Sequence, residues 1–416
     1  MTRRRRIALL VIVTILLVSA LALRWLLNPG YLVPALLGLA GKSLGLEITA
    51  SGVGEYRLRG TPQLIARNVV ARAPGAKNAV LRAERLFISV PWSTLRARGS
   101  DLTAHRLELD APVLDVAAFQ SWQSKRPPSK TPIPTLYRGI GIVRGQVIGD
   151  GWKMDNLDAD LQSLAPDQPL RTHVRGRYVG SGMHVPIDVY ATLTEPASGA
   201  GIGVAGQASV ESGEWRVPSR ITLSAKLRTE TGIRLQRAVF GARSRYVSGD
   251  TSLPFALGIA GPLRFDGAAI ELQPAGLSLR GKDAMPTLDA AGGFSLADGM
   301  RIDLDGRLAG WPSAWPALPP PLGQSTSPLP FALAYEGAGD LSAVASLQLQ
   351  RDGTVFDGRF RLFEVMDWID AGAKGSPLPP VAGTLKTPKL EISGAVLEDV
   401  ELQLEDPAIP VATATE

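Results

Sequence analysis

The stretch from Arg220 to Arg228, RITLSAKLR, alternates strictly between polar and apolar residues. Its apolar positions are Ile221, Leu223, Ala225 and Leu227. Side chains of a β-strand point alternately to its two faces, so a period of two predicts a strand with one apolar and one polar face. The same alternation recurs at Leu107 and Leu109, at Ile302, Leu304 and Leu308, at Leu390 and Ile392, and at Val400, Leu402 and Leu404.

This recurrence predicts a mainly β fold built from an elongated antiparallel sheet. The chain contains 44 glycines and 32 prolines among its 416 residues, which is too many for a helical protein. The Asp-Gly pairs at 150–151, 298–299 and 352–353 predict tight turns between strands. We expect only three short helices, over residues 91–98, 116–124 and 363–373.

The apolar face admits two interpretations, which periodicity alone does not separate. It closes on itself as the core of a sandwich or barrel, or it stays open as a curved groove that lines acyl chains, which need only apolar contact. Candidate lipid-facing residues are Leu107, Leu109, Leu223, Leu304, Leu390, Ile392, Leu402 and Leu404.

The net charge of +5 is concentrated at the N-terminus. Of the 44 Lys and Arg residues, four are Arg3, Arg4, Arg5 and Arg6, which leaves 40 cationic against 39 acidic residues in the rest of the chain. A nearly neutral body argues against a nucleic-acid partner, because binding the phosphate backbone requires cations gathered on the folded domain.

Residues 7–27 form an apolar run that would span a bilayer as a helix. The basic tip before it places the N-terminus in the cytoplasm and the body on the other side of the membrane. We favour an uncleaved transmembrane anchor; the alternative is a signal peptide cleaved after Ala22, and both export the body. Residues 28–45 then predict a short amphipathic segment, either at the membrane surface or packed on the first strands.

Two proline-rich stretches, residues 125–134 and 310–330, are interpreted as stiff linkers or as loops that cover sheet edges. They predict three β modules in the body, over residues 46–124, 135–311 and 330–406.

Catalytic and cofactor motifs lack their required surroundings. Gly41 to Gly45 matches G-x-S-x-G without the strand before it, and Gly201 to Gly206 matches G-x-G-x-x-G inside an apparent strand. Cysteine is absent, and His105, His173 and His184 are not spaced as metal ligands. We therefore expect neither an enzyme nor a bound cofactor or metal.

Ordered segments resemble the AsmA-like proteins of Gram-negative bacteria. After the basic tip, the anchor and Asn28-Pro29, these are LEI at 46–48, TPQLIARNV at 61–69, LRAERLFISV at 81–90, LELDAPVLDV at 107–116, AGTLKTPKLEISG at 382–394 and VELQL at 400–404.

The resemblance implies anchorage in the inner membrane and a periplasmic β groove that takes part in phospholipid transport or outer-membrane homeostasis. It brings no catalytic residues. We therefore expect the inner membrane and phospholipid as partners. The alternative is a non-transporting assembly or secretion-accessory factor, with a closed β domain that docks on an envelope protein.

Overall fold

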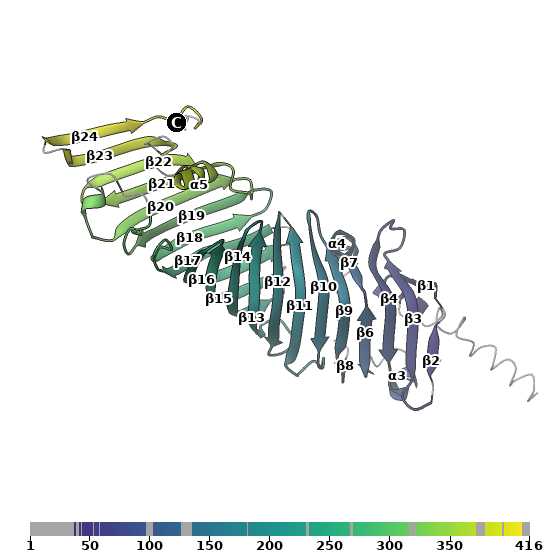
Figure 1. The fold of residues 1–416 in the computed structure, drawn as a ribbon. Coiled ribbons are helices and arrows are strands. Elements are labelled where there is room, and N and C mark those ends of the chain that lie inside the picture. The colour runs from purple at the N-terminus through teal and green to yellow at the C-terminus, as the bar shows by residue number, and fades with distance from the viewer. Residues whose placement is uncertain are drawn as a thin grey trace, which may run out of the picture. The chain divides into compact units, whose positions relative to one another are not determined.

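The computed structural model describes residues 37–409, apart from 97–102, 126–134, 372–378 and interruptions of one to three residues. Strands dominate the described residues, which confirms the mainly β expectation (Figure 1). The arginines of the tip and the apolar run at 7–27 lie outside the described residues. In the described part of the chain, no helix combines the length and the apolar character that crossing a membrane requires.

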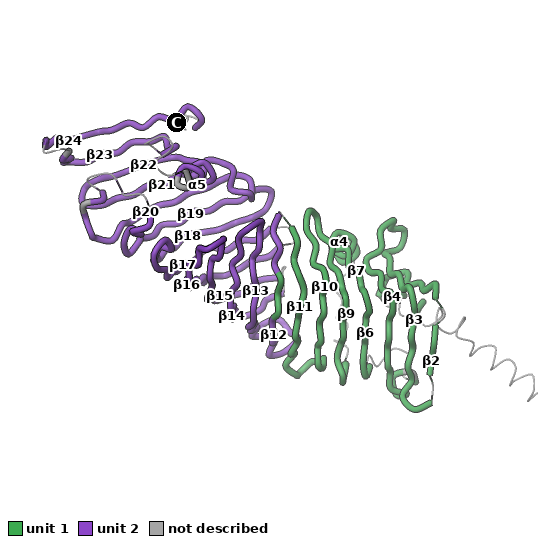
Figure 2. The backbone as a smooth tube through the Cα atoms, viewed as in Figure 1, with its two compact units in different colours: residues 1–180, 186–188 green, residues 181–185, 189–416 purple. Residues whose placement is uncertain are grey.

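The chain divides into two compact units, coloured separately in Figure 2. Unit 1 comprises residues 1–180 and 186–188, and unit 2 comprises residues 181–185 and 189–416. β12 (Met183–Leu193) contributes residues to both. The boundary between the units lies near residue 180 and not at either proline-rich stretch. Strands from both sides of residues 126–134 pair within unit 1, and Trp311 and Trp315 pack on strands of unit 2.

Unit 1 is a mixed sheet in which two of the strand pairs are parallel. Its strands are β1 (Glu47–Ala50), β2 (Glu55–Arg57), β3 (Gln63–Arg72), β4 (Ala79–Ser89), β6 (Arg106–Asp110), β7 (Val113–Asp115), β9 (Ile140–Ile148), β10 (Trp152–Leu161) and β11 (Leu170–Gly180). β9 runs parallel to β6 and β7, whereas the other pairs in this sheet are antiparallel. The short strands β5 (Thr103–Ala104) and β8 (Thr135–Leu136) form a separate parallel pair.

Two of the three expected helices belong to unit 1, as α3 (Trp92–Arg96) and α4 (Val116–Ser124). Asp115 caps α4 by accepting a hydrogen bond from the backbone N–H of Ala118 at 2.9 Å. Trp122 of α4 donates its indole N–H to the carbonyl of Leu44 at 3.2 Å. Leu37 is buried against Ala66 and Val69 of β3, so the described part of the expected amphipathic segment packs on the first strands.

Unit 2 is built from strands that pair antiparallel in chain order. They are β13 (Gly201–Ser212), β14 (Trp215–Arg228), β15 (Ile233–Ser248), β16 (Thr251–Asp266), β17 (Ala269–Gly281), β18 (Leu288–Leu296), β19 (Met300–Leu308), β20 (Leu329–Gly337), β21 (Val344–Arg351), β22 (Thr354–Arg361), β23 (Val381–Ile392) and β24 (Ala395–Leu404). Each pairs with the next, from β13–β14 to β23–β24. No pairing between described residues joins β24 back to β13, so the pairing leaves this sheet unclosed.

Short connections explain this regular order. At the β21–β22 turn, Asp352 and Gly353 have φ of 49° and 83°, the conformation that a two-residue hairpin loop requires. The third expected helix is α5 (Leu362–Ala371), which follows β22 and contacts it. A 3-10 turn, η1 (Leu322–Gln324), precedes β20.

Candidate functional site

One continuous apolar row crosses unit 2 from β13 to β24. Each strand contributes the residue that lies directly opposite the row member of the strand before it. The row is Val204, Leu223, Phe240, Ile259, Leu277, Ala290, Gly306, Phe331, Leu349, Phe356, Leu385 and Leu402. Directly opposite side chains lie on the same face of a sheet, so the row is an unbroken apolar strip perpendicular to the strands.

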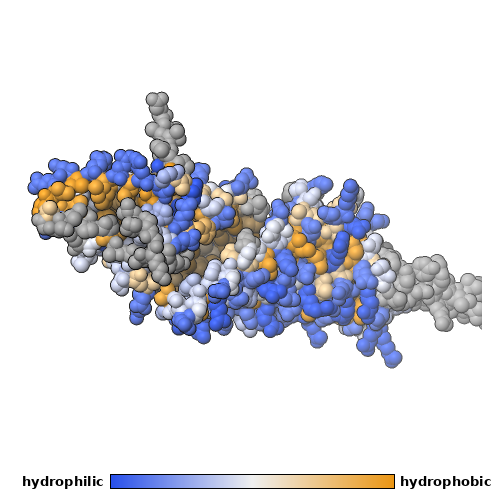
Figure 3. Space-filling model, turned by 45° about the horizontal axis from the view of Figure 1, so that its top comes forward, coloured by the Kyte–Doolittle hydropathy of each residue, from blue (hydrophilic) through white to orange (hydrophobic). Residues whose placement is uncertain are grey.

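The first half of the row is partly accessible to solvent. Its members in β13 to β18, from Val204 to Ala290, are all half-buried. In Figure 3, apolar side chains of unit 2 gather in a hollow with hydrophilic side chains along its borders. Such a surface retains apolar area that a ligand could remove from water, which a closed core would not.

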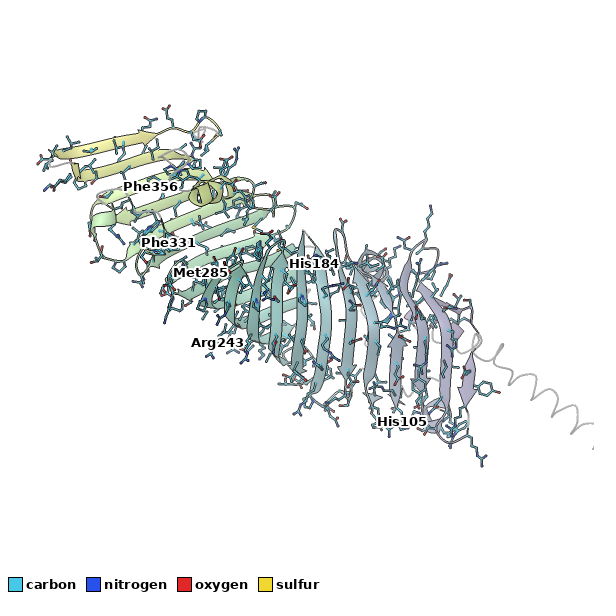
Figure 4. All side chains as sticks on the ribbon, viewed as in Figure 1. His105, His184, Arg243, Met285, Phe331 and Phe356 are labelled. Carbon is cyan, nitrogen blue, oxygen red and sulfur yellow. The ribbon has the colours of Figure 1, made fainter. Side chains whose placement is uncertain are left out.

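Gly306 is the row member that has no side chain, and the aromatic ring of Phe331 fills the place that a side chain would take. A Cβ on Gly306 would lie only 2.6 Å from Cζ of Phe331. The ring of Phe356 similarly lies beside Gly358, where a Cβ would come within 2.4 Å of it (Figure 4). The two rings keep the strip apolar across positions that have no side chain.

From β20 to β23 the row is covered by the described residues among 309–328, namely 309–315, 318 and 322–328, which we call the cover segment. Trp311, Trp315, Leu318 and Leu322 of this segment pack with the buried Leu308, Leu329, Leu349 and Leu385 of the sheet. Two groups hold the segment in place: the Trp315 indole N–H donates to the carbonyl of Ala284 at 2.8 Å, and Arg351 donates to the carbonyls of Leu322 and Ser325, both at 2.8 Å. The apolar face is therefore accessible in β13 to β18 and protected in β20 to β23.

Of the predicted lipid-facing residues, Leu223 and Leu402 belong to the row itself. Leu304 and Leu404 belong to the neighbouring row on the same face, which runs Leu304, Leu333, Leu347, Gly358, Gly383 and Leu404. Leu402 is 43% exposed, because β24 is the last strand and nothing in the described residues covers it there.

Two further predicted residues of β23 stand apart from this strip. Leu390 is buried, at 3% exposed, but the consecutive exposed residues Pro388 and Lys389 break the alternation between it and Leu385. It lies opposite Leu397 of β24 and belongs to neither row. The side chain of Ile392 lies outside the described residues, as do those of Arg3, Arg4, Arg5 and Arg6.

Leu107 and Leu109 lie in unit 1, where a comparable strip exists. Leu109 lies between Leu86 of β4 and Ile142 of β9, and Leu107 lies between Ile88 and Ile140 of the same strands. Both leucines are half-buried. The structure thus places six of the eight predicted residues on two apolar strips, four in unit 2 and two in unit 1.

The polar face of unit 1 carries compensated charges. Arg144 binds Asp110 and Glu84, each at 2.8 Å, and these carboxylates raise the pKa of its guanidinium. Asp155, 6% exposed, accepts two hydrogen bonds from Arg177, at 2.9 and 3.2 Å. The bond from Arg177 lowers the pKa of the Asp155 carboxyl, and Lys153 at 3.3 Å lowers it further. The pairs of Arg144 with Asp110 and of Arg177 with Asp155 join strands that are hydrogen-bonded to each other, so the architecture of the sheet explains them.

The histidines that were considered as metal ligands lie apart from one another. His173 contacts Asp188 at 2.6 Å and the His105 ring lies 5.7 Å from that of Tyr137. Among the described residues, no three His, Cys, Asp or Glu side chains are grouped so that they could hold a metal ion. Residues 201–206 lie in β13, paired residue by residue with β14, so this glycine pattern belongs to a strand.

Sequence reasoning missed most of the row, including Phe240, Ile259 and Leu277. Their strands do alternate, but the pattern is diluted by glycine and alanine and shifted by irregularities at Leu235/Ala238 and Ala260/Leu263. It also missed that the cover segment packs on the face of the sheet. Trp311 and Trp315 could have indicated this packing, because large apolar side chains are uncommon in a linker that is surrounded by water.

Comparison of the chain with protein-family models, with curated proteins and with solved structures gave no match.

Proposed function

We propose that this chain is a single-pass inner-membrane protein whose periplasmic body binds phospholipid acyl chains along the apolar row of unit 2. In this proposal it takes part in phospholipid transport or outer-membrane homeostasis. The observation that carries the proposal is the continuity of the row, together with its half-buried state from Val204 to Ala290.

The chemistry of an acyl chain matches such a strip. An acyl chain presents no hydrogen-bonding groups, so an unbroken series of apolar side chains can hold it at any point along the strip. Covering about 200 Å² of apolar surface would contribute roughly 5 kcal/mol, which favours binding while permitting movement. A single charged row member would interrupt the strip, because an unpaired charge is costly to remove from water.

Two sequence features support the location. The basic tip followed by the apolar run at 7–27 indicates an anchor with its N-terminus in the cytoplasm. The ordered segments that resemble AsmA-like proteins point to the same membrane and to the same kind of cargo. The resemblance includes the tip and the anchor, and its last two segments contain the row members Leu385 and Leu402, so these features support one location together.

The test compares two neighbouring residues of β14 in the full chain. Leu223→Asp places a charge in the row, whereas Ser224→Asp places the same charge at an exposed position on the opposite face. We expect Leu223→Asp to lose both co-purified phospholipid and photocrosslinking to lipid from a benzophenone at position 259. Ser224→Asp should retain both at the level of the unmodified protein.

Retention of lipid by Leu223→Asp, or equal loss in both variants, would contradict the proposal. An unmodified protein that purifies from membranes without phospholipid would also contradict it and would favour an accessory role in envelope assembly or secretion. Circular dichroism of each variant shows whether the sheet has formed, which separates loss of binding from loss of folding.

A further inference from the structure

A row of cationic residues crosses the polar face of unit 2, on the side of the sheet opposite Leu223. Gln207, Arg220, Arg243, Ala256 and Arg280 lie directly opposite one another across β13 to β17. Arg220 and Arg243 are thus direct cross-strand neighbours of like charge, an arrangement that destabilises a sheet unless an anion compensates it.

This row borders a cavity of about 770 Å³. Its cationic lining residues are Arg220, Arg243, Arg245, Arg280 and Lys282, and no acidic residue lines it among those described. Ala256 separates Arg243 from Arg280 within the row, so its small side chain leaves space between the two guanidinium groups. The volume lies in the range of pockets that hold small molecules.

The cationic side chains of this cavity form fewer hydrogen bonds and ion pairs with the protein than other arginines on the polar face do. In the described part of the chain, the side chains of Arg220, Arg243 and Lys282 form no hydrogen bond or ion pair. By contrast, Arg301 binds Glu336 at 2.7 Å, and Arg280 binds Asp289 at 2.7 Å at the margin of the cavity. Among the described residues, the Arg245 side chain donates only to the hydroxyl of Ser252, at 3.2 Å.

We propose that this cavity binds a phosphate group, held between Arg220 and Arg243 with Lys282 as a further cation (Arg243 is labelled in Figure 4). Arginine presents N–H groups in a planar fork that matches two phosphate oxygens, and two such forks on adjacent strands can share one anion. The phosphate belongs either to a lipid headgroup or to a soluble phosphorylated compound. The site lies on the face opposite the apolar row, so it does not rest on the acyl-chain proposal.

The experiment titrates the full chain, in a neutral detergent, with inorganic pyrophosphate and with dihexanoyl phosphatidic acid, using calorimetry. Dihexanoyl phosphatidylcholine, which carries no net charge, is the lipid control. Arg220→Gln combined with Arg243→Gln should weaken phosphate binding at least about tenfold, the equivalent of one charge-assisted hydrogen bond. Arg216→Gln removes the same charge from an exposed position of β14 outside the cavity, and should leave binding nearly unchanged.

The two probes distinguish the sources of the phosphate. Binding of pyrophosphate would show that the phosphate group suffices, whereas binding of phosphatidic acid alone would identify a lipid headgroup. Absence of binding by both, or an equal loss with Arg216→Gln, would overturn the proposal. Without ligand, the double variant should melt at a higher temperature than the unmodified protein, because the opposition of like charges is removed; a misfolded variant would melt lower.

Discussion

At the residue scale, Asp155 is the buried acid whose removal has the clearest consequence. It lies directly opposite Arg177 across β10 and β11 and receives both hydrogen bonds that the guanidinium directs to it. Asp155→Asn removes the charge and keeps the shape, so we expect unit 1 to lose about 1–3 kcal/mol at pH 7, measured by urea unfolding. Asp160→Asn is the matched control, because Asp160 is exposed and its pair with Arg106 should contribute less than about 1 kcal/mol.

The lowered pKa of the Asp155 carboxyl makes its contribution to the stability of the fold depend on pH. Arg177 lowers this pKa below the value of about 3.9 that an aspartate has in an unfolded chain. The contribution to stability is therefore complete above about pH 4 and is lost as the pH falls through the folded-state pKa. The stability difference between the unmodified protein and Asp155→Asn should shrink when unfolding is measured at successively lower pH. A difference that stays constant from pH 7 to pH 3 would contradict this.

At the element scale, the cover segment determines how much of the apolar face is accessible. Trp315 packs with the buried leucines of β19 to β23 and bonds the carbonyl of Ala284. We expect Trp315→Ala to cost about 2–4 kcal/mol, because it leaves a space in the cluster, and to increase protease cleavage within residues 309–328. Trp315→Phe keeps most of the packing and loses the indole hydrogen bond, and should cost about 1 kcal/mol.

The same variant makes a prediction about lipid access. A benzophenone at position 349 should crosslink little lipid in the unmodified protein, since Leu349 is buried under the cover segment. Trp315→Ala should increase that crosslinking, while labelling at position 259, in the uncovered half of the row, should stay the same. Equal labelling at position 349 with and without Trp315 would show that the cover segment does not limit access to the row.

Elements were more predictable than the contacts between them. The strands around Leu223 and Leu304 follow from local alternation, because this pattern is a property of neighbouring residues. The row was not predictable, because it depends on the register of each strand against the next. Register is decided by hydrogen bonds between segments and by local irregularities such as the one near Ala238. Leu390 illustrates this limit, because the alternation of buried and exposed residues breaks at Pro388 and Lys389 within a strand whose sequence predicts a regular alternation.

At the scale of the whole molecule, the division into two units predicts more than one unfolding transition. Each unit has its own buried cluster, around Ala66 in unit 1 and around Leu329 in unit 2. We expect Asp155→Asn to lower the midpoint of one transition and Trp315→Ala that of the other. Their effects should add within about 0.5 kcal/mol in the double variant, because the two sites share no partners. A single transition that both substitutions shift equally would contradict the independence of the units.

The row runs across the strands and not along them, so its extent is counted in strands. Each strand adds one residue and about 4.8 Å, and a hairpin adds two strands without reversing the direction of the chain. Insertion or loss of whole hairpins would therefore lengthen or shorten the strip in steps of about 10 Å while its width and lining stayed constant. Insertion of a single residue within a strand would instead turn the following side chains to the other face. If the row binds acyl chains as we propose, duplication of a hairpin would fit the sheet to a longer cargo without a change in the kind of residue that lines the strip.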